Sequence, residues 1–148
     1  MVDRSAIGFA LPPTTARVEA GRLAFFLKAI GDRNPAFGEA GSGRGTQIPP
    51  TYLFCLEMLD APDTFAFLKA LDIDLGRVLH GDQSFEYHAP VRVGDELTFA
   101  SRVEDVFDKK GGALTFVVQT TVVTNQSGVK VATLRRSIVV RNPREAAA

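Results

Sequence analysis

A helix is expected near the start of the chain, because apolar residues recur there at helical spacing. Between residues 19 and 30, four of them stand at i, i+3, i+4 and i+7 and would share one face: Leu23, Phe26, Leu27 and Ile30. Gly31 follows them and is a suitable residue to end a helix. A short strand near Thr15–Val18 is expected to precede this helix.

A second helix is expected to begin after Pro49 and Pro50, since proline is favoured in the first turn of a helix. Seven of the ten residues from Thr51 to Asp60 are apolar and cover nearly every side, which is typical of a buried helix. A shorter helical piece would follow around residues 65–71. The long loop of residues 31–50 is rich in glycine at residues 41–45, and such loops in compact domains are usually functional or mobile.

From residue 78 onward, apolar and polar residues alternate, which is the pattern of strands. The pattern predicts four of them: Val78–Val91, Glu96–Phe107, Ala113–Thr124 and Val129–Arg141. Glycine-bearing turns at residues 93–95, 109–112 and 125–128 separate the strands, so we expect consecutive antiparallel hairpins. One apolar helix before such a sheet favours an α+β fold, with the sheet curled around the helix in a single domain of residues 1–148.

Composition excludes several classes of function. Lysine plus arginine and aspartate plus glutamate each number 17, so the net charge is zero and no overall field attracts the chain to a nucleic acid. No uncharged run reaches the roughly 18 residues that a membrane-spanning helix needs. Cys55 is the only cysteine, which rules out an intrachain disulfide and favours a reducing compartment. We therefore expect a cytoplasmic protein with neither nucleic-acid nor membrane partners.

Three segments together resemble one family of enzymes. Residues 31–35 read Gly-Asp-Arg-Asn-Pro, which resembles the Gly-Asp-x-Asn-Pro signature of MaoC-like, (R)-specific enoyl-thioester hydratases and dehydratases. Residues 48–53 are similar to the start of the central helix of their hot-dog fold, and residues 85–95 to their second strand and the turn after it. The likeness extends from about Val18 to Arg141, nearly the whole chain.

The resemblance implies a hot-dog domain that binds an acyl thioester of coenzyme A or of acyl-carrier protein. It also implies reversible addition of water to a trans-2-enoyl group, and a homodimer or a heterodimer with another hot-dog chain. Neither a metal nor a redox cofactor is implied. In the catalytic members a histidine stands two positions after the proline of the signature, where this chain has Phe37.

Within the family, this chain resembles the non-catalytic members in particular. They include the amino-terminal halves of double-hot-dog dehydratases and the non-catalytic subunits of heterodimeric dehydratases. These proteins share the Pro-Pro-Thr helix start, and their strand entry is similar to the His-Gly-Asp-Gln found here at residues 80–83.

Hydration of an enoyl thioester needs a base for water, an acid for Cα and donors for the developing oxyanion. Asp32 is the candidate base and Asn34 would orient the water, although both residues are also common caps of loop turns. His80 is the candidate for the missing acid, beside Gly81, which would let a ligand approach. His88, the other histidine, is expected to be structural or solvent-facing.

Substrate binding is expected around the start of the second helix, where backbone N–H groups would polarise the thioester carbonyl. The residues assigned to substrate binding are Phe37, Pro50, Thr51 and Tyr52.

Three functions remain open from the sequence. The first is an active hydratase that uses Asp32 and a noncanonical acid, and the second is a non-catalytic subunit that shapes the substrate channel for a partner chain with the full Asp–His pair. The third is a hot-dog thioesterase, which would need a carboxylate on the central helix, where Glu57 is the only candidate. The thioesterase is the least favoured, because it would make the signature at residues 31–35 a coincidence.

Overall fold

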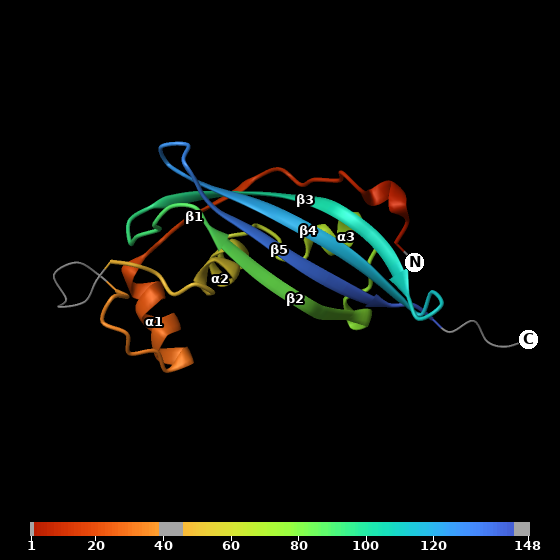
Figure 1. Ribbon diagram of the computed structural model, residues 1–148, viewed down its shortest axis with the longest axis horizontal. Coiled ribbons are helices and arrows are strands. Elements are labelled where there is room, and N and C mark those ends of the chain that lie inside the picture. The colour runs from red at the N-terminus through yellow and green to blue at the C-terminus, as the bar shows by residue number, and fades with distance from the viewer. Residues whose placement is uncertain (1, 39–45, 144–148) are drawn as a thin grey trace, which may run out of the picture.

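The computed structural model describes residues 2–38 and 46–143. Its elements follow one another in the order η1 (Arg4–Ala6), β1 (Thr14–Arg17), α1 (Ala20–Ile30), α2 (Tyr52–Leu59), α3 (Ala66–Ala70), η2 (Leu75–Arg77), β2 (Val78–Tyr87), β3 (Glu96–Lys109), β4 (Leu114–Asn125) and β5 (Lys130–Arg141). The long strands β2 to β5 curve over α2, and α1 lies below one end of the sheet (Figure 1). This is the α+β hot-dog arrangement expected from the sequence. Within the described residues, no helix combines the length and the apolar character needed to cross a bilayer.

Five strands form one antiparallel sheet in the order β1-β3-β4-β5-β2. Their bounds lie close to the predicted ones, and the main difference is that β2 ends at Tyr87 rather than at Val91. At that point the N–H groups of His88 and Ala89 both donate to Val131 O, at 2.8 and 3.3 Å. Pro90 then has no N–H with which to continue the ladder.

The first predicted hairpin is wrong. β2 pairs with β5 and not with β3, because both sides of β3 are already taken by β1 and β4. The turn at residues 93–95 instead leads the chain from one side of the sheet to the other, and two bonds of 2.9 Å hold it to the end of β1: Gly94 N–H donates to Val18 O, and Val18 N–H to Asp95 O. The other two turns join β3 to β4 and β4 to β5, as predicted.

The central helix α2 supplies the middle of the core, as predicted. Tyr52, Leu53 and Leu56 are fully buried, and burial of one leucine side chain contributes about 1.5–3 kcal/mol. The residues that pack in the same cluster come from α1, β1 and the sheet, and include Val18, Leu23, Leu27, Leu97, Phe99, Val123 and Leu134. A second cluster joins Phe67 and Leu68 of α3 to the other half of the sheet.

The first helix, α1, ends at the predicted residue. Gly31 adopts the left-handed conformation with φ of 71°, and its N–H donates to the carbonyl oxygens of Leu27 and Lys28. A glycine in this conformation is the common way to end a helix, since it has no Cβ to clash. The chain can therefore turn sharply into the loop that carries Asp32 and Asn34.

Gly81 produces a bulge in the outer strand β2. The pairing of β2 with β5 shifts by one residue between His80 and Asp82, and Gly81 lies directly against β5 at Ser137 and Val139. The glycine was expected to leave room for a ligand, but the close neighbour is the next strand of the sheet.

The substitution Gly81→Ala tests the packing at this bulge. A Cβ at position 81 would lie 2.9 Å from Val139 Cγ2 and 3.1 Å from Ser137 O, so the strand pair must shift, at a cost of about 1–3 kcal/mol. The matched control is Gly21→Ala in α1, where no atom lies within 4 Å of the added carbon and a gain of up to about 1 kcal/mol is expected. Urea unfolding measures both, and equal stability of the two variants would contradict this description.

Candidate functional site

A cavity of about 590 Å³ lies between the loop before α2 and the end of β2. Its lining contains three of the residues that the sequence assigned to the site: Asn34, Phe37 and Pro50. The opposite wall comes from the end of β2 and the segment after it, with Tyr87, His88, Ala89 and Val91. The structure therefore brings part of the predicted loop site to one hollow at the amino-terminal end of α2.

The two described ends of the loop are held together by backbone bonds. Gln47 N–H donates to Ala36 O at 3.1 Å, and Gly38 N–H donates to Gln47 O at 3.3 Å. Gln47 also forms a bridge to Arg92, so the loop is tied to the segment that follows β2. The glycine-rich residues 41–45, which were expected to be flexible, lie outside the described residues.

Asp32 and Asn34 both hold the backbone of the loop. The Oδ1 atom of Asp32 accepts the N–H of Asn34 at 2.8 Å, and the Oδ1 atom of Asn34 accepts the N–H of Ala36 at 3.0 Å. These are the capping roles that Asp and Asn often have in turns. Asn34 also lines the cavity, whereas Asp32 is not among the described residues that line it. Their catalytic roles stay a prediction.

The start of α2 is fixed by a tyrosine from the sheet. Tyr87 donates its hydroxyl hydrogen to Pro50 O at 2.6 Å, and burial raises the pKa of this phenol well above its usual value. Tyr87 is therefore a neutral donor at physiological pH, and it joins the end of β2 to the first turn of α2. Both residues line the cavity.

Unlike Pro50, neither Thr51 nor Tyr52 faces the cavity among the described residues. Tyr52 is fully buried, and its ring packs against Phe26 with 5.1 Å between the ring centroids. Burial also raises the pKa of its hydroxyl. Thr51 is exposed at the start of α2, where its side chain makes no capping hydrogen bond. Neither residue is among the described residues that line the cavity, so their assignment to substrate binding stays a prediction.

His80 and His88 lie at opposite ends of the outer strand. Eight residues of extended chain span about 26 Å, so His80 is far from the cavity, and its ring lies 5.3 Å from that of Phe54. His88 instead lines the cavity, and its Nε2 atom is 2.9 Å from Thr133 Oγ1 on β5. From the sequence, His88 was expected to be structural or solvent-facing, because the pattern of one strand does not show which residues lie opposite its end.

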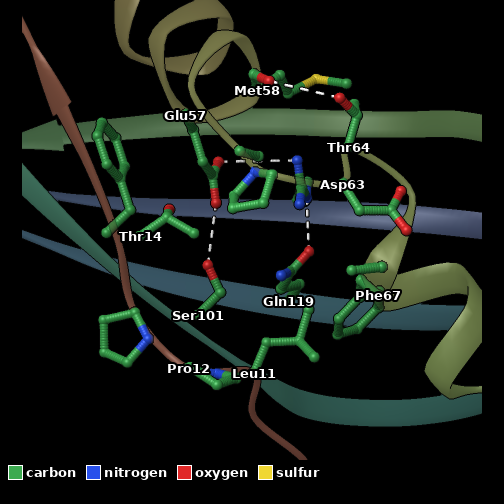
Figure 2. Close-up of a pocket in the computed structure, with 16 residues that line it drawn as sticks. Leu11, Pro12, Thr14, Glu57, Met58, Asp63, Thr64, Phe67, Ser101 and Gln119 are labelled. Carbon is green, nitrogen blue, oxygen red and sulfur yellow. Dashed lines mark hydrogen bonds and ion pairs between the residues drawn. The ribbon is translucent and has the colours of Figure 1, made fainter.

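A second cavity, of about 310 Å³, lies beside the carboxyl-terminal half of α2. Figure 2 shows Glu57 directed from the helix toward the sheet, where its carboxylate contacts Ser101. Arg136 and Gln119 complete the polar side of this cavity. Glu57 was the carboxylate considered for a thioesterase, and it lies apart from the loop residues Asn34 and Phe37.

The fold is shared with solved hot-dog proteins. The C-terminally truncated HadBC (3R-hydroxyacyl-ACP dehydratase) complex of Mycobacterium tuberculosis superposes with a TM-score of 0.71 and 24% identity, over 90% of this chain and 96% of that one. The (R)-hydratase of A. caviae that is involved in PHA biosynthesis gives a TM-score of 0.62 and 21% identity, over 93% and 96% of the two chains. At these identities the likeness shows the fold alone.

Sequence comparison shows the family. A UPF0336 protein of Streptomyces coelicolor is 34% identical over 98% of this chain and 99% of its own length, and one of Streptomyces griseus gives the same figures. Residues 5–134 match the family model described as the FAS1-like, dehydratase domain region. The chain therefore belongs to the UPF0336 proteins and to the family of FAS1-like dehydratase domains, and it has the hot-dog fold.

Proposed function

We propose that this chain binds an acyl thioester as one subunit of an (R)-specific enoyl-thioester hydratase or 3-hydroxyacyl dehydratase, and that a partner chain supplies the catalytic acid and base. The main support for this proposal is the identity of the residue at position 37, a phenylalanine. Phe37 lines the loop cavity at the position of the signature where, by resemblance, catalytic members have a histidine.

The loop cavity has the size and character of a thioester site. Small-molecule sites usually measure about 300–1,000 Å³ and combine apolar walls with a few polar groups. Here the apolar residues Phe37, Ile48 and Val91 stand with Asn34 and His88 around about 590 Å³. Such a lining suits a short acyl chain next to a polar thioester.

In the described part of the chain, this cavity has Phe37 where, by resemblance, catalytic members carry a histidine. A phenylalanine cannot carry a proton, and one positioned acid–base group is typically worth about 10²–10⁴-fold in rate. Asp32 retains its second oxygen as an acceptor, but its Oδ1 atom is already bonded to the loop backbone. A partner chain with Gly-Asp-x-Asn-Pro-x-His would provide the missing pair.

Heteromeric neighbours support a two-chain assembly. Among the solved structures of this fold are the HadBC complex and the ChsH1-ChsH2 complex, both from Mycobacterium tuberculosis. This chain has an edge that suits pairing, since β2 is bonded to β5 on one side and is exposed along most of its length. An exposed edge strand is a ready template for pairing with a second chain.

A self-sufficient hydratase is the second candidate, and His88 is the observation that favours it. His88 lines the same cavity as Asn34 and would deliver the proton to Cα in place of the missing histidine. His80 would reach such a site only from a second copy of the chain. Antiparallel pairing of two β2 strands would set the start of one strand, with its His80, beside the end of the other.

A thioesterase is the least supported of the three functions. It would use Glu57 as the base, but the Oε1 atom of Glu57 accepts from Ser101 at 2.9 Å and from Thr121 at 3.2 Å. Arg136 lies beside the other oxygen, with its Nη1 atom 3.7 Å from Oε2. One oxygen of this carboxylate is thus already bonded within the chain, and the other faces a guanidinium instead of a water-binding loop.

The subunit role predicts that the purified chain hydrates crotonyl thioester weakly or not at all. Loss of enoyl absorbance should be at least about 10²-fold slower than for the chain mixed with a hot-dog partner that carries the Asp–His pair. In the mixture, Asp32→Asn, His80→Ala and His88→Ala of this chain should each leave the rate within about threefold of the wild type, because the partner performs the proton transfers.

Fast turnover by the chain alone would contradict the subunit role. If Asp32→Asn then abolished the turnover, the self-sufficient hydratase would replace it, and His88→Ala or His80→Ala would identify the acid. The asparagine retains the Oδ1 acceptor for the loop, so Asp32→Asn removes the charge without removing the turn.

The exposed edge of the sheet leads to a further prediction, that β2 forms the interface between the two chains. Light scattering at tens of micromolar should give the mass of two hot-dog chains, either for this chain alone or with its partner. Leu79→Lys, on the exposed edge strand, should weaken this association at least about tenfold. The control is Val129→Lys in the turn before β5. Val129 is 46% exposed and Leu79 is 49% exposed, and the control should leave the association intact. A monomeric mass under both conditions would contradict the proposal.

A further inference from the structure

The cavity beside the carboxyl-terminal half of α2 has an apolar mouth. Its rim comes from three separate parts of the chain: the segment before β1, the end of α2 and α3. The apolar residues there include Leu11, Pro12, Met58, Pro62 and Phe67, while Asp63 on the same rim is paired with Lys69 at 2.6 Å. The volume of about 310 Å³ is at the lower end of the usual range for small-molecule sites, about 300–1,000 Å³.

The floor of this cavity is polar and charged. Glu57 points from α2 toward Ser101 of β3, and Gln119 of β4 lies beside Ser101 (Figure 2). Arg136 of the next strand, β5, also lines this cavity. Arg136 donates its Nε hydrogen to Gln119 Oε1 at 2.6 Å. The side chains of Glu57 and Arg136 are only 11% and 17% exposed, so one carboxylate and one guanidinium are set between a helix and a sheet.

The floor groups retain hydrogen-bonding capacity. Glu57 Oε2 and Arg136 Nη1 are 3.7 Å apart, longer than the usual hydrogen bond of about 2.7–3.2 Å. In the described part of the chain, no acceptor lies within bonding distance of the Gln119 amide nitrogen or of the two Nη atoms of Arg136. The floor therefore presents an acceptor and several donors side by side.

A buried ion pair of this kind does little for stability, since the cost of removing two charges from water can exceed their attraction. Apolar residues of similar volume would fill the space between α2 and the sheet at least as well. The position of the Glu57–Arg136 pair at the floor of an open cavity therefore favours a role in ligand recognition over a purely structural role.

We propose that this cavity binds a compact, uncharged amphiphile whose polar end both donates and accepts hydrogen bonds, namely an alcohol or a primary carboxamide. Its donor would bond to Glu57 Oε2, its acceptor would take hydrogens from Arg136 and Gln119, and its apolar body would lie against Met58 and Phe67. A carboxylate meets repulsion from Glu57 and an ammonium group meets repulsion from Arg136, so charged ends are disfavoured. The site is separate from the loop cavity and does not depend on the function proposed there.

Hexanamide, hexanoate and hexylamine test this inference, because they share one carbon chain and differ in the charge of the polar end. Calorimetry should give hexanamide a dissociation constant at least about tenfold lower than that of either charged probe. Nuclear magnetic resonance should show saturable shifts of the Gln119 side-chain amide and of the Ser101 backbone amide. Absence of a saturable shift at these residues, or equal binding of hexanoate, would overturn the inference.

Two variants should change the selectivity in opposite directions. Glu57→Gln leaves Arg136 as the unbalanced charge of the floor, so hexanoate should gain at least about tenfold and exceed hexanamide. Arg136→Gln leaves Glu57 unbalanced, so hexylamine should gain instead. The control Glu104→Gln removes the exposed pair with Arg135 and should change none of the three constants.

Circular dichroism checks the folding of each variant, and the wild-type probe series decides the question if a variant does not fold. If a folded Glu57→Gln variant bound the three probes in the same order of affinity as the wild type, the charges of the floor would not determine selectivity, and the proposal would be overturned. Binding of an acyl thioester at the loop cavity should be the same in all three variants, which distinguishes this site from the proposed function.

Discussion

The burial of α2 against the curved sheet joins the helical and strand layers of the domain. Leu53 and Leu56 are fully buried in the cluster that joins the helix to the sheet, and an eight-residue helix of this composition has no stable form in water without such a cover. Because the interior is close-packed, the two hollows lie toward the ends of the helix and not at its middle. Each combines residues from α2 or its first turn with side chains from the sheet.

The two ends of α2 offer different chemistry. At the first turn, Tyr87 holds Pro50 while Phe37 and His88 line a mixed cavity, for which we propose thioester binding. At the second end, Glu57 and Arg136 place one charge of each sign at the floor of a small cavity. The same helix thus borders both proposed sites, one for an acyl thioester and one for an uncharged amphiphile.

Local patterns in the sequence predicted the helices and strands of the fold. The strand order and the contacts between distant residues could not be predicted, because they depend on long-range pairing. Periodicity gave both main helices and all four long strands to within a few residues, and Gly31 marked the end of α1. The hairpin predicted between β2 and β3 was wrong, because turn residues do not reveal that β2 pairs with the distant β5. The placement of His88, and the meeting of Glu57 with Arg136, likewise depend on strand order and register, which no short segment encodes. Family resemblance, not periodicity, pointed to the loop with Asn34.

We propose that the hollow between the loop and the first turn of α2 receives the acyl group. A crystal structure with bound butyryl-coenzyme A, which cannot be hydrated, would locate that group. We expect the butyryl chain against Phe37 and Val91, with the thioester near Asn34 and the start of α2. Density for the ligand only at the β3–β4 or β4–β5 turns, with the loop cavity unchanged, would contradict it.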